Sequence, residues 1–224
     1  MDLEFIKNLK IKYSKIRDPI YGFIELPEKF KPIIDHALFQ RLRRINQLPL
    51  EDMVYPSSMQ SRFEHSLGTM YLAMLAATSL VKNSAVILGK LFNKEELYQG
   101  IDESIEKQKQ FIYSAGLIGL LHDIGHGPFS HTLEYALENT NDYSYCHEKV
   151  GIKIINKICS DLKLSKTTYF QYAIIILDKS IKREDLTDIQ KILRDLIDHD
   201  LIDVDKGDYL LRDAYHCGVP YGIY

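Results

Sequence analysis

Histidine and aspartate side chains gather in the segment HDIGHGPFSH, where they are His122, Asp123, His126 and His131. An adjacent His-Asp pair offers a neutral imidazole nitrogen and a carboxylate. This donor set suits a divalent transition metal or magnesium better than it suits a structural zinc site built from thiolates. Because two protein ligands are too few, we consider His65 and Asp205, each in a predicted helix of its own, as the third and fourth.

The segment follows an apolar stretch, Phe111 to Leu121, that predicts a central buried helix. A single histidine at a helix end is commonly a cap for the free carbonyl groups and binds no metal. That interpretation is weak here, because burying three imidazoles and a carboxylate beside a Leu- and Ile-rich helix is costly unless a metal or hydrogen bonds compensate. We therefore interpret HDIGHGPFSH as a functional segment.

The predicted last helix, over residues 203–217, carries a second polar feature. Five polar side chains recur at spacings that share one helix face: Asp205, Tyr209, Arg212, Asp213 and His216. The opposite, buried side is predicted to consist of Leu210, Leu211 and Ala214. Together with Lys206, the polar face is expected to line a cavity for an anionic, ring-bearing ligand such as a nucleotide. A solvent-exposed amphipathic face is the alternative.

The elements that must position these residues are predominantly helical. Residues 11–27 are rich in Ile and Tyr and are interrupted by Asp18-Pro19 and Gly22, which predicts a short β-hairpin or extended arm. Apolar residues at helical spacing begin at Ile33 and recur further along the chain, twice behind a capping box. The later helices are expected after Ser61, over 111–121, over 150–158, after Thr187 and over 203–217. The predicted fold class is all-α with one hairpin.

Composition sets limits on the kind of protein. The 224 residues are 46% hydrophobic and 26% charged, with a formal net charge of −3, which is typical of one folded domain. No apolar run approaches the roughly 20 residues that cross a bilayer, and the N-terminus lacks a signal-peptide pattern. We therefore expect a cytoplasmic protein with no membrane contact. The slight acidity disfavours a nucleic-acid partner, although Arg41, Arg43 and Arg44 could form a local basic patch.

Five segments, in this order, resemble one known family: DPIYGFIEL, IIDHALFQRLRRINQL, RFEHSLG, LLHDIGHGPFSH and DVDKGDYLLRD. The chain is similar to the HD-domain metal-dependent phosphohydrolases, in particular the deoxynucleoside triphosphate triphosphohydrolases of animals and bacteria. The resemblance implies that residues 1–224 form a single HD domain, a helical bundle with a short hairpin or arm near its N-terminus. Family members continue with further helices, so we expect this chain to lack the family's C-terminal helical region.

The resemblance also implies roles for individual residues. The metal ligands would be His65, His122, Asp123 and Asp205. The substrate-binding residues would be Arg62, Gln47, Leu48, Lys206, Tyr209 and Asp213. The catalytic positions would be His126, His131, Glu134 and His147, where Glu134 replaces the Asp of the animal enzymes. The set implies one divalent ion, with Fe, Mn, Zn, Ni and Mg not distinguished, and leaves room for a second Mg ion that accompanies the nucleotide.

The reaction implied is hydrolysis of a deoxynucleoside triphosphate to a deoxynucleoside and intact triphosphate. A metal polarises the α-phosphoryl group and lowers the pKa of water, and a histidine protonates the departing 5′-oxygen. His131 or His126 is the expected proton donor, oriented by Glu134 or His147. Arg62 and Lys206 are expected to neutralise the phosphates.

Regulation is also implied by the resemblance, since some members bind an activating guanine nucleotide and form homo-oligomers. The residues that match that allosteric site are Asp35, Gln40, Arg43, Val54 and Tyr55. Two other functions remain open. One is a nucleotide-binding regulatory or partner-dependent HD module that is inactive alone, and the other is an HD phosphodiesterase or nuclease.

Overall fold

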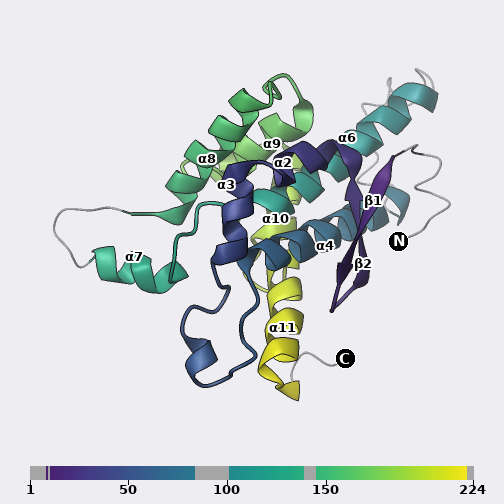
Figure 1. Ribbon diagram of the computed structural model, residues 1–224. Coiled ribbons are helices and arrows are strands. Elements are labelled where there is room, and N and C mark those ends of the chain that lie inside the picture. The colour runs from purple at the N-terminus through teal and green to yellow at the C-terminus, as the bar shows by residue number, and fades with distance from the viewer. Residues whose placement is uncertain (1–8, 10, 84–100, 139–144, 221–224) are drawn as a thin grey trace.

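Two long helices form the centre of the fold in the computed structural model, which describes residues 9, 11–83, 101–138 and 145–220 (Figure 1). Helix α4 (Arg62–Asn83) packs along α6 (Ile101–Leu121), and this is the most extensive contact between elements. The predicted run from Phe111 to Leu121 is buried at every position, as expected for a central helix. Among the described helices, none combines the length and apolar character that a membrane-spanning helix requires.

The predicted hairpin is present beside α4. Strands β1 (Tyr13–Asp18) and β2 (Gly22–Pro27) pair antiparallel, with Tyr13 opposite Pro27 and Asp18 opposite Gly22. Gly22 adopts a φ of 72°, a left-handed conformation that glycine reaches without strain. The predicted class, a helical domain with a hairpin near its N-terminus, is confirmed.

Residues 28–44 form short helical turns rather than one helix. The sequence pattern from Ile33 onward gave no sign of these breaks. His36 interrupts the path, because its backbone is extended and its imidazole accepts the backbone N–H of Leu38 as an N-cap. The turns are η1 (Glu28–Phe30), α2 (Lys31–Ile34), α3 (Ala37–Gln40) and η2 (Arg41–Arg44), and the loop that follows contains η3 (Glu51–Met53).

Both predicted capping boxes form. Before α4, the backbone N–H of Ser61 donates to the Glu64 carboxylate at 2.9 Å, and the backbone N–H of Glu64 donates to the Ser61 hydroxyl at 3.4 Å. Thr187 and Gln190 cap α10 (Asp188–Ile197) in the same reciprocal way. These caps satisfy N–H groups that a helix start leaves free, and so fix where each helix begins.

The remaining helices surround the central pair (Figure 1). Predictions are confirmed for α8, α10 and α11, and α11 is followed by the cap residue Gly218, which has a φ of 69°. Two further helices, α7 and α9, were not predicted. The bounds are α7 (Ser130–Glu138), α8 (His147–Asp161), α9 (Thr168–Leu177), η5 (Arg183–Asp185), α10 (Asp188–Ile197) and α11 (Val204–Cys217).

The buried face of α11 differs from the prediction. Leu210 was expected on the buried side but is 46% exposed, whereas Ala214 is buried as expected. The face packed against α4 carries Asp208, Arg212 and Asp213 instead. A polar helix face can be buried in this way because its charged groups bind one another and a histidine of α4.

Candidate functional site

The four predicted metal ligands converge although they come from three parts of the chain. His65 lies in the first turn of α4, His122 and Asp123 directly follow α6, and Asp205 lies in the first turn of α11. His65 Nε2 is 2.9 Å from Asp205 Oδ1 and 3.3 Å from His122 Nε2. His122 Nε2 is 3.4 Å from Asp123 Oδ1. Ligands about 2.1 Å from one ion are about 3.0 to 3.4 Å apart, so the donor atoms of His65, His122 and Asp205 fit a divalent cation. Asp123 lies beside them and is paired with Arg62.

The protonation of these groups also fits a cation. Burial acts to lower the pKa of His65, but hydrogen bonds that its ring donates to Asp205 and Asp208 raise it to about 10. Burial acts to raise the pKa of Asp123, but His122 and Arg62 hold it well below the usual range. The ionised carboxylates therefore favour positive charge on the neighbouring imidazoles. A divalent ion that displaces the imidazole protons would supply that positive charge instead.

Arg62 lies beside the candidate metal centre in a buried position. Its guanidinium pairs with Asp123, and its Nε donates to the Ser130 hydroxyl at 2.9 Å. Phe129 and Ser130 both have positive φ, of 63° and 47°. Left-handed backbone costs a residue other than glycine about 1 to 3 kcal/mol and is concentrated at functional sites. The turn that carries Ser130 is therefore held in this conformation by its surroundings.

The four predicted catalytic residues form a second cluster next to Asp123. One donor atom from each of His126, His131, Glu134 and His147 lies within 4.8 Å of the others. Glu134 accepts hydrogen bonds from His131 Nδ1 at 2.8 Å and from His147 Nδ1 at 2.7 Å. The His126 and His147 rings stack with centroids 3.9 Å apart. The cluster joins the metal centre, since His126 Nε2 is 3.4 Å from Asp123 Oδ1.

Hydrogen bonds and burial shift the pKa values of Glu134 and His126 in this cluster. Burial acts to raise the pKa of Glu134, but the backbone N–H of His147 and the two imidazoles lower it to about 2. Burial lowers the pKa of His126 to about 4. Glu134 thus accepts hydrogen bonds from two imidazole rings through a carboxylate with a lowered pKa.

Arg41 holds the loop between the two clusters in place, a role that the sequence did not reveal. Its guanidinium donates to the carbonyl of His126 at 2.6 Å and to that of Ile124. Arg43 donates to the Gln40 side chain at 2.8 Å and lies over the Phe63 ring. Two of the three arginines that could form a basic patch are therefore engaged within the chain.

Gly125 is a position where a side chain has no room. A Cβ there would lie 1.8 Å from the His147 carbonyl oxygen and 2.5 Å from the Gly151 nitrogen, both backbone atoms at the start of α8. Gly125→Ala is therefore expected to move α8 away from the loop, to lower unfolding free energy by about 1 to 3 kcal/mol and to separate His147 from His126. Thermal unfolding measures the stability loss.

Gly127→Ala is the matched control in the same loop. Its Cβ would meet flexible groups at 3.3 Å, the end of the Leu133 side chain and the Tyr145 hydroxyl. We expect at most a small change in melting temperature. Equal destabilisation by both substitutions would contradict the close backbone approach at Gly125.

The predicted substrate residues lie in several environments. Asp213 is buried and accepts a hydrogen bond from the Gln60 side chain at 2.8 Å, while the Gln60 carbonyl accepts the backbone N–H of Gln47 at 2.9 Å. Gln60, which the sequence did not single out, thereby links these two predicted residues. Lys206 instead donates to Asp203 at 2.5 Å and to the His199 carbonyl at 2.9 Å. Leu48 and Tyr209 are half-buried.

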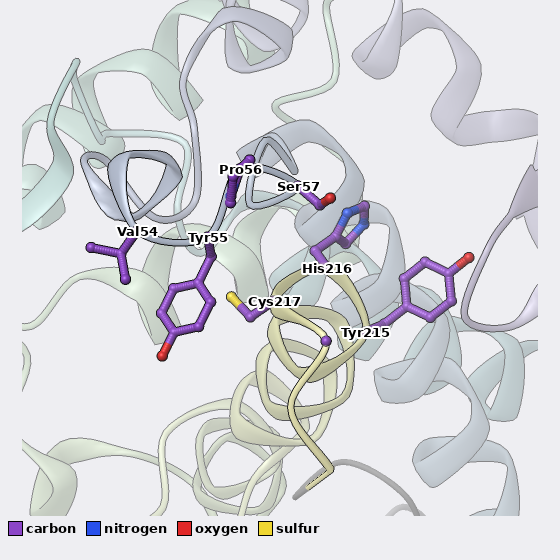
Figure 2. A pocket seen from close by; sticks show the side chains of 8 residues that line it. Val54, Tyr55, Pro56, Ser57, Tyr215, His216 and Cys217 are labelled. Carbon is purple, nitrogen blue, oxygen red and sulfur yellow. The ribbon is translucent and has the colours of Figure 1, made fainter.

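The predicted allosteric residues line two separate cavities. Asp35, Gln40 and Arg43 lie in a cavity of about 460 Å³ next to the hairpin. Val54 and Tyr55 line another, of about 390 Å³, where the loop before α4 meets the end of α11 (Figure 2). Figure 2 shows His216 and Cys217 of α11 opposite that loop.

One residue beside the metal centre was missed by the sequence interpretation. Asp208 of α11 is fully buried, and its Oδ2 accepts a hydrogen bond from His65 Nδ1 at 2.8 Å. A metal-binding histidine commonly donates its second ring N–H to such a carboxylate, which fixes the tautomer and the ring orientation. The only local signal is the spacing of Asp208 and Arg212, which allows an ion pair within one helix.

Comparison with known proteins finds the HD domain family, which matches residues 62–213. A deoxynucleoside triphosphate triphosphohydrolase SAMHD1 homolog of Dictyostelium discoideum is 33% identical over 92% of this chain and 37% of its own length. An uncharacterized protein of Methanocaldococcus jannaschii, MJ1154, is 37% identical over 93% of this chain and 35% of its own. The mouse deoxynucleoside triphosphate triphosphohydrolase SAMHD1 is 29% identical over 97% and 34%. The chain thus spans about a third of the length of each.

Proposed function

Because the chain belongs to the HD domain family, we propose that it is a metal-dependent phosphohydrolase that cleaves deoxynucleoside triphosphates to deoxynucleoside and triphosphate. The observation that carries the proposal is the convergence of His65, His122 and Asp205, with Asp123 beside them, next to a hydrogen-bonded His/Glu cluster. The substrate class is supported by the names of the Dictyostelium and mouse relatives.

The four ligands would hold one divalent ion, and a second Mg ion would arrive with the nucleotide. When bound, such an ion supplies Lewis acidity toward a phosphoryl oxygen and lowers the pKa of water. The guanidinium of Arg62 pairs with Asp123 and therefore lies beside the candidate metal ligands. This position supports a role for Arg62 in binding phosphate oxygens. A guanidinium can bind two oxygens of one phosphate through parallel hydrogen bonds.

We assign the proton donor to His131. The departing 5′-oxygen needs a proton, and a histidine can supply it near neutral pH. The His131 side chain is 71% exposed, so it can regain a proton from solvent between turnovers, and Glu134 orients its ring. His126 is the alternative donor, but it is 1% exposed and has no such access. His147 shares Glu134 and supports the same arrangement.

Deoxyribose recognition is assigned to Gln47 and Leu48, with Tyr209 and Asp213 on the facing helix. The Gln47 Oε1 atom is buried without a hydrogen-bond partner among the described residues. A buried acceptor that lacks a partner is costly, which supports a ligand hydroxyl as its partner. Lys206 would reach the phosphates only by leaving Asp203.

The proposal includes activation of the protein by a guanine nucleotide. Asp35, Gln40 and Arg43 line one cavity, which supports a guanine nucleotide as its ligand. Val54 and Tyr55 lie in the other cavity and would contact a second nucleotide or a neighbouring subunit of a homo-oligomer. Both assignments follow the family resemblance.

The experiment is incubation of the purified, metal-analysed protein with each deoxynucleoside triphosphate and Mn²⁺, with and without GTP, followed by chromatography of the products. We expect a deoxynucleoside and intact triphosphate in a 1:1 ratio. Nucleotide binding without any product would contradict hydrolysis and favour a regulatory HD module. Cleavage of an oligonucleotide, with no triphosphate released, would favour a phosphodiesterase or nuclease.

A further inference from the structure

A buried carboxylate connects the metal centre to the hairpin. Asp208 Oδ2 accepts from His65 Nδ1 at 2.8 Å and from Arg212 Nε at 2.9 Å. Its Oδ1 accepts from the Tyr21 hydroxyl at 2.8 Å and from an Arg212 terminal nitrogen at 2.9 Å. Both carboxylate oxygens are therefore fully used, and their partners come from α4, α11 and the turn between β1 and β2.

Arg212 continues the connection to the hairpin turn. Its other terminal nitrogen donates to Asp18 Oδ2 at 3.0 Å, and both Arg212 and Asp18 are buried. Asp18 Oδ1 accepts the backbone N–H groups of Ile20 and Tyr21 at 2.8 and 3.0 Å, which shapes the turn. Each oxygen of Asp18 thus has a separate task, one in the turn and one toward Arg212.

Asp208 and Arg212 approach α4 closely at Gly68. A Cβ at Gly68 of α4 would lie 1.8 Å from Asp208 Oδ1 and 2.5 Å from an Arg212 nitrogen. The absence of a side chain at Gly68 is what lets this ion pair approach α4 so closely. This close approach lets Asp208 reach His65, one helical turn earlier on α4.

We propose that Asp208, Arg212 and Asp18 form a positioning network that holds the metal ligand His65 in its binding orientation and makes metal affinity depend on the hairpin turn. The proposal rests on the proposed function in taking His65 as a metal ligand. None of the three residues belongs to the groups of side chains that could hold a metal ion. They act through the His65 ring, which must carry its proton on Nδ1 for Nε2 to bind a metal.

A charged network of this kind has a physical reason to be rigid. Asp208 and Arg212 form a two-point hydrogen-bonded pair away from water, where ionic hydrogen bonds are strong and an unpaired charge is costly. Moving the His65 ring would break the hydrogen bond to Asp208, and moving Asp208 would leave Asp18 as the remaining carboxylate partner of Arg212 among the described residues. The orientation of His65 is thereby tied to the whole set.

Asp18→Asn tests the remote end of the network selectively. Asparagine keeps an oxygen for the two N–H groups of the turn but turns an NH₂ group toward Arg212. Asp178→Asn is the matched control. Asp178 Oδ1 likewise accepts a backbone N–H, that of Ser180 at 2.9 Å, but in an exposed turn outside the network. The readout is the dissociation constant for Mn²⁺, measured without substrate by competition with a chelator.

Asp208→Asn is expected to weaken Mn²⁺ binding by about 10- to 100-fold, and Asp18→Asn by about 2- to 30-fold. The double variant should bind no more weakly than Asp208→Asn alone, because residues that act as one unit are not additive. The Asp178→Asn control should bind as the wild type does. Circular dichroism and melting temperature confirm that each variant is folded, and Asp18→Asn alone decides the test if Asp208→Asn does not fold.

The network is overturned if the Asp18→Asn protein binds Mn²⁺ as tightly as the control, whether its melting temperature is unchanged or lowered. A lower melting temperature with unchanged affinity would show that Asp18 has a purely structural role. The proposed function fails differently, when a chain that binds Mn²⁺ releases no triphosphate. The affinity test keeps its meaning in that case, since it uses no substrate.

Discussion

Asp123→Ala is expected to abolish triphosphate release, with a loss of at least about 10³-fold in kcat, similar to other removals of an essential catalytic group. The substitution takes one carboxylate from the metal donor set and also removes the partner of Arg62. The side chain of Arg62 is only 4% exposed. Breaking a buried ion pair by removing one partner costs about 3 to 5 kcal/mol, so the melting temperature should also fall. Metal content, product formation and thermal unfolding are measured together.

Asp123→Asn separates the two effects. Asparagine retains an acceptor for Arg62 and the side-chain volume, so it should lose activity and metal while unfolding closer to the wild type. Asp195→Ala is the surface control, since its pair with Arg183 is solvent-exposed and is expected to contribute at most about 1 kcal/mol. An Asp123→Asn protein that keeps its metal and turnover would refute the placement of Asp123 in the metal site.

The candidate site was predictable where local signals fix the start of a helix. The Ser61–Glu64 capping box places His65 in the first turn of α4. Asp203 accepts the backbone N–H of Lys206 as the N-cap of α11, which places Asp205 at its beginning. Side-chain direction follows from position within a helical turn, so these short motifs determine much of the geometry without knowledge of the packing.

Asp208 and Leu210 show why the rest was not predictable. Whether a polar residue on an amphipathic helix is buried depends on the partner it meets, here His65, which is far away in sequence. The apolar Leu210 is correspondingly left exposed. The space that admits the Asp208–Arg212 pair depends on Gly68, a residue of another helix. Such long-range complementarity has no signature in the pattern of one helix.

Helix α9 was missed for a different reason. Its sequence, TYFQYAIIIL, is almost uniformly apolar and packs against α6, with Phe170 and Ala173 fully buried. Periodicity separates helix from strand only when one face is polar. A short apolar run rich in Ile is therefore ambiguous from sequence, and its contact with the central helix decides the outcome.

His131→Gln is expected to lower kcat by about 10²- to 10⁴-fold, the usual contribution of a general acid, while metal content and KM stay near the wild-type values. The reason is that His131 contacts Glu134 at 2.8 Å and lies outside the group formed by His65, His122 and Asp205. Its exposed side chain contributes little to the core, so the protein should unfold at an unchanged temperature. Steady-state kinetics with a deoxynucleoside triphosphate measure kcat and KM separately, and metal analysis measures the metal content.

His199→Gln provides the matched control, since it removes an imidazole outside both clusters, and it should retain full activity. The alternative donor gives a different pattern. If His126 protonates the leaving oxygen, His131→Gln costs little and His126→Gln accounts for the loss in kcat. Glu134→Gln discriminates further, because both His131 and His147 donate to that carboxylate. A loss in Glu134→Gln that matches His131→Gln, and is not increased in the double variant, indicates that Glu134 acts by orienting the donor ring.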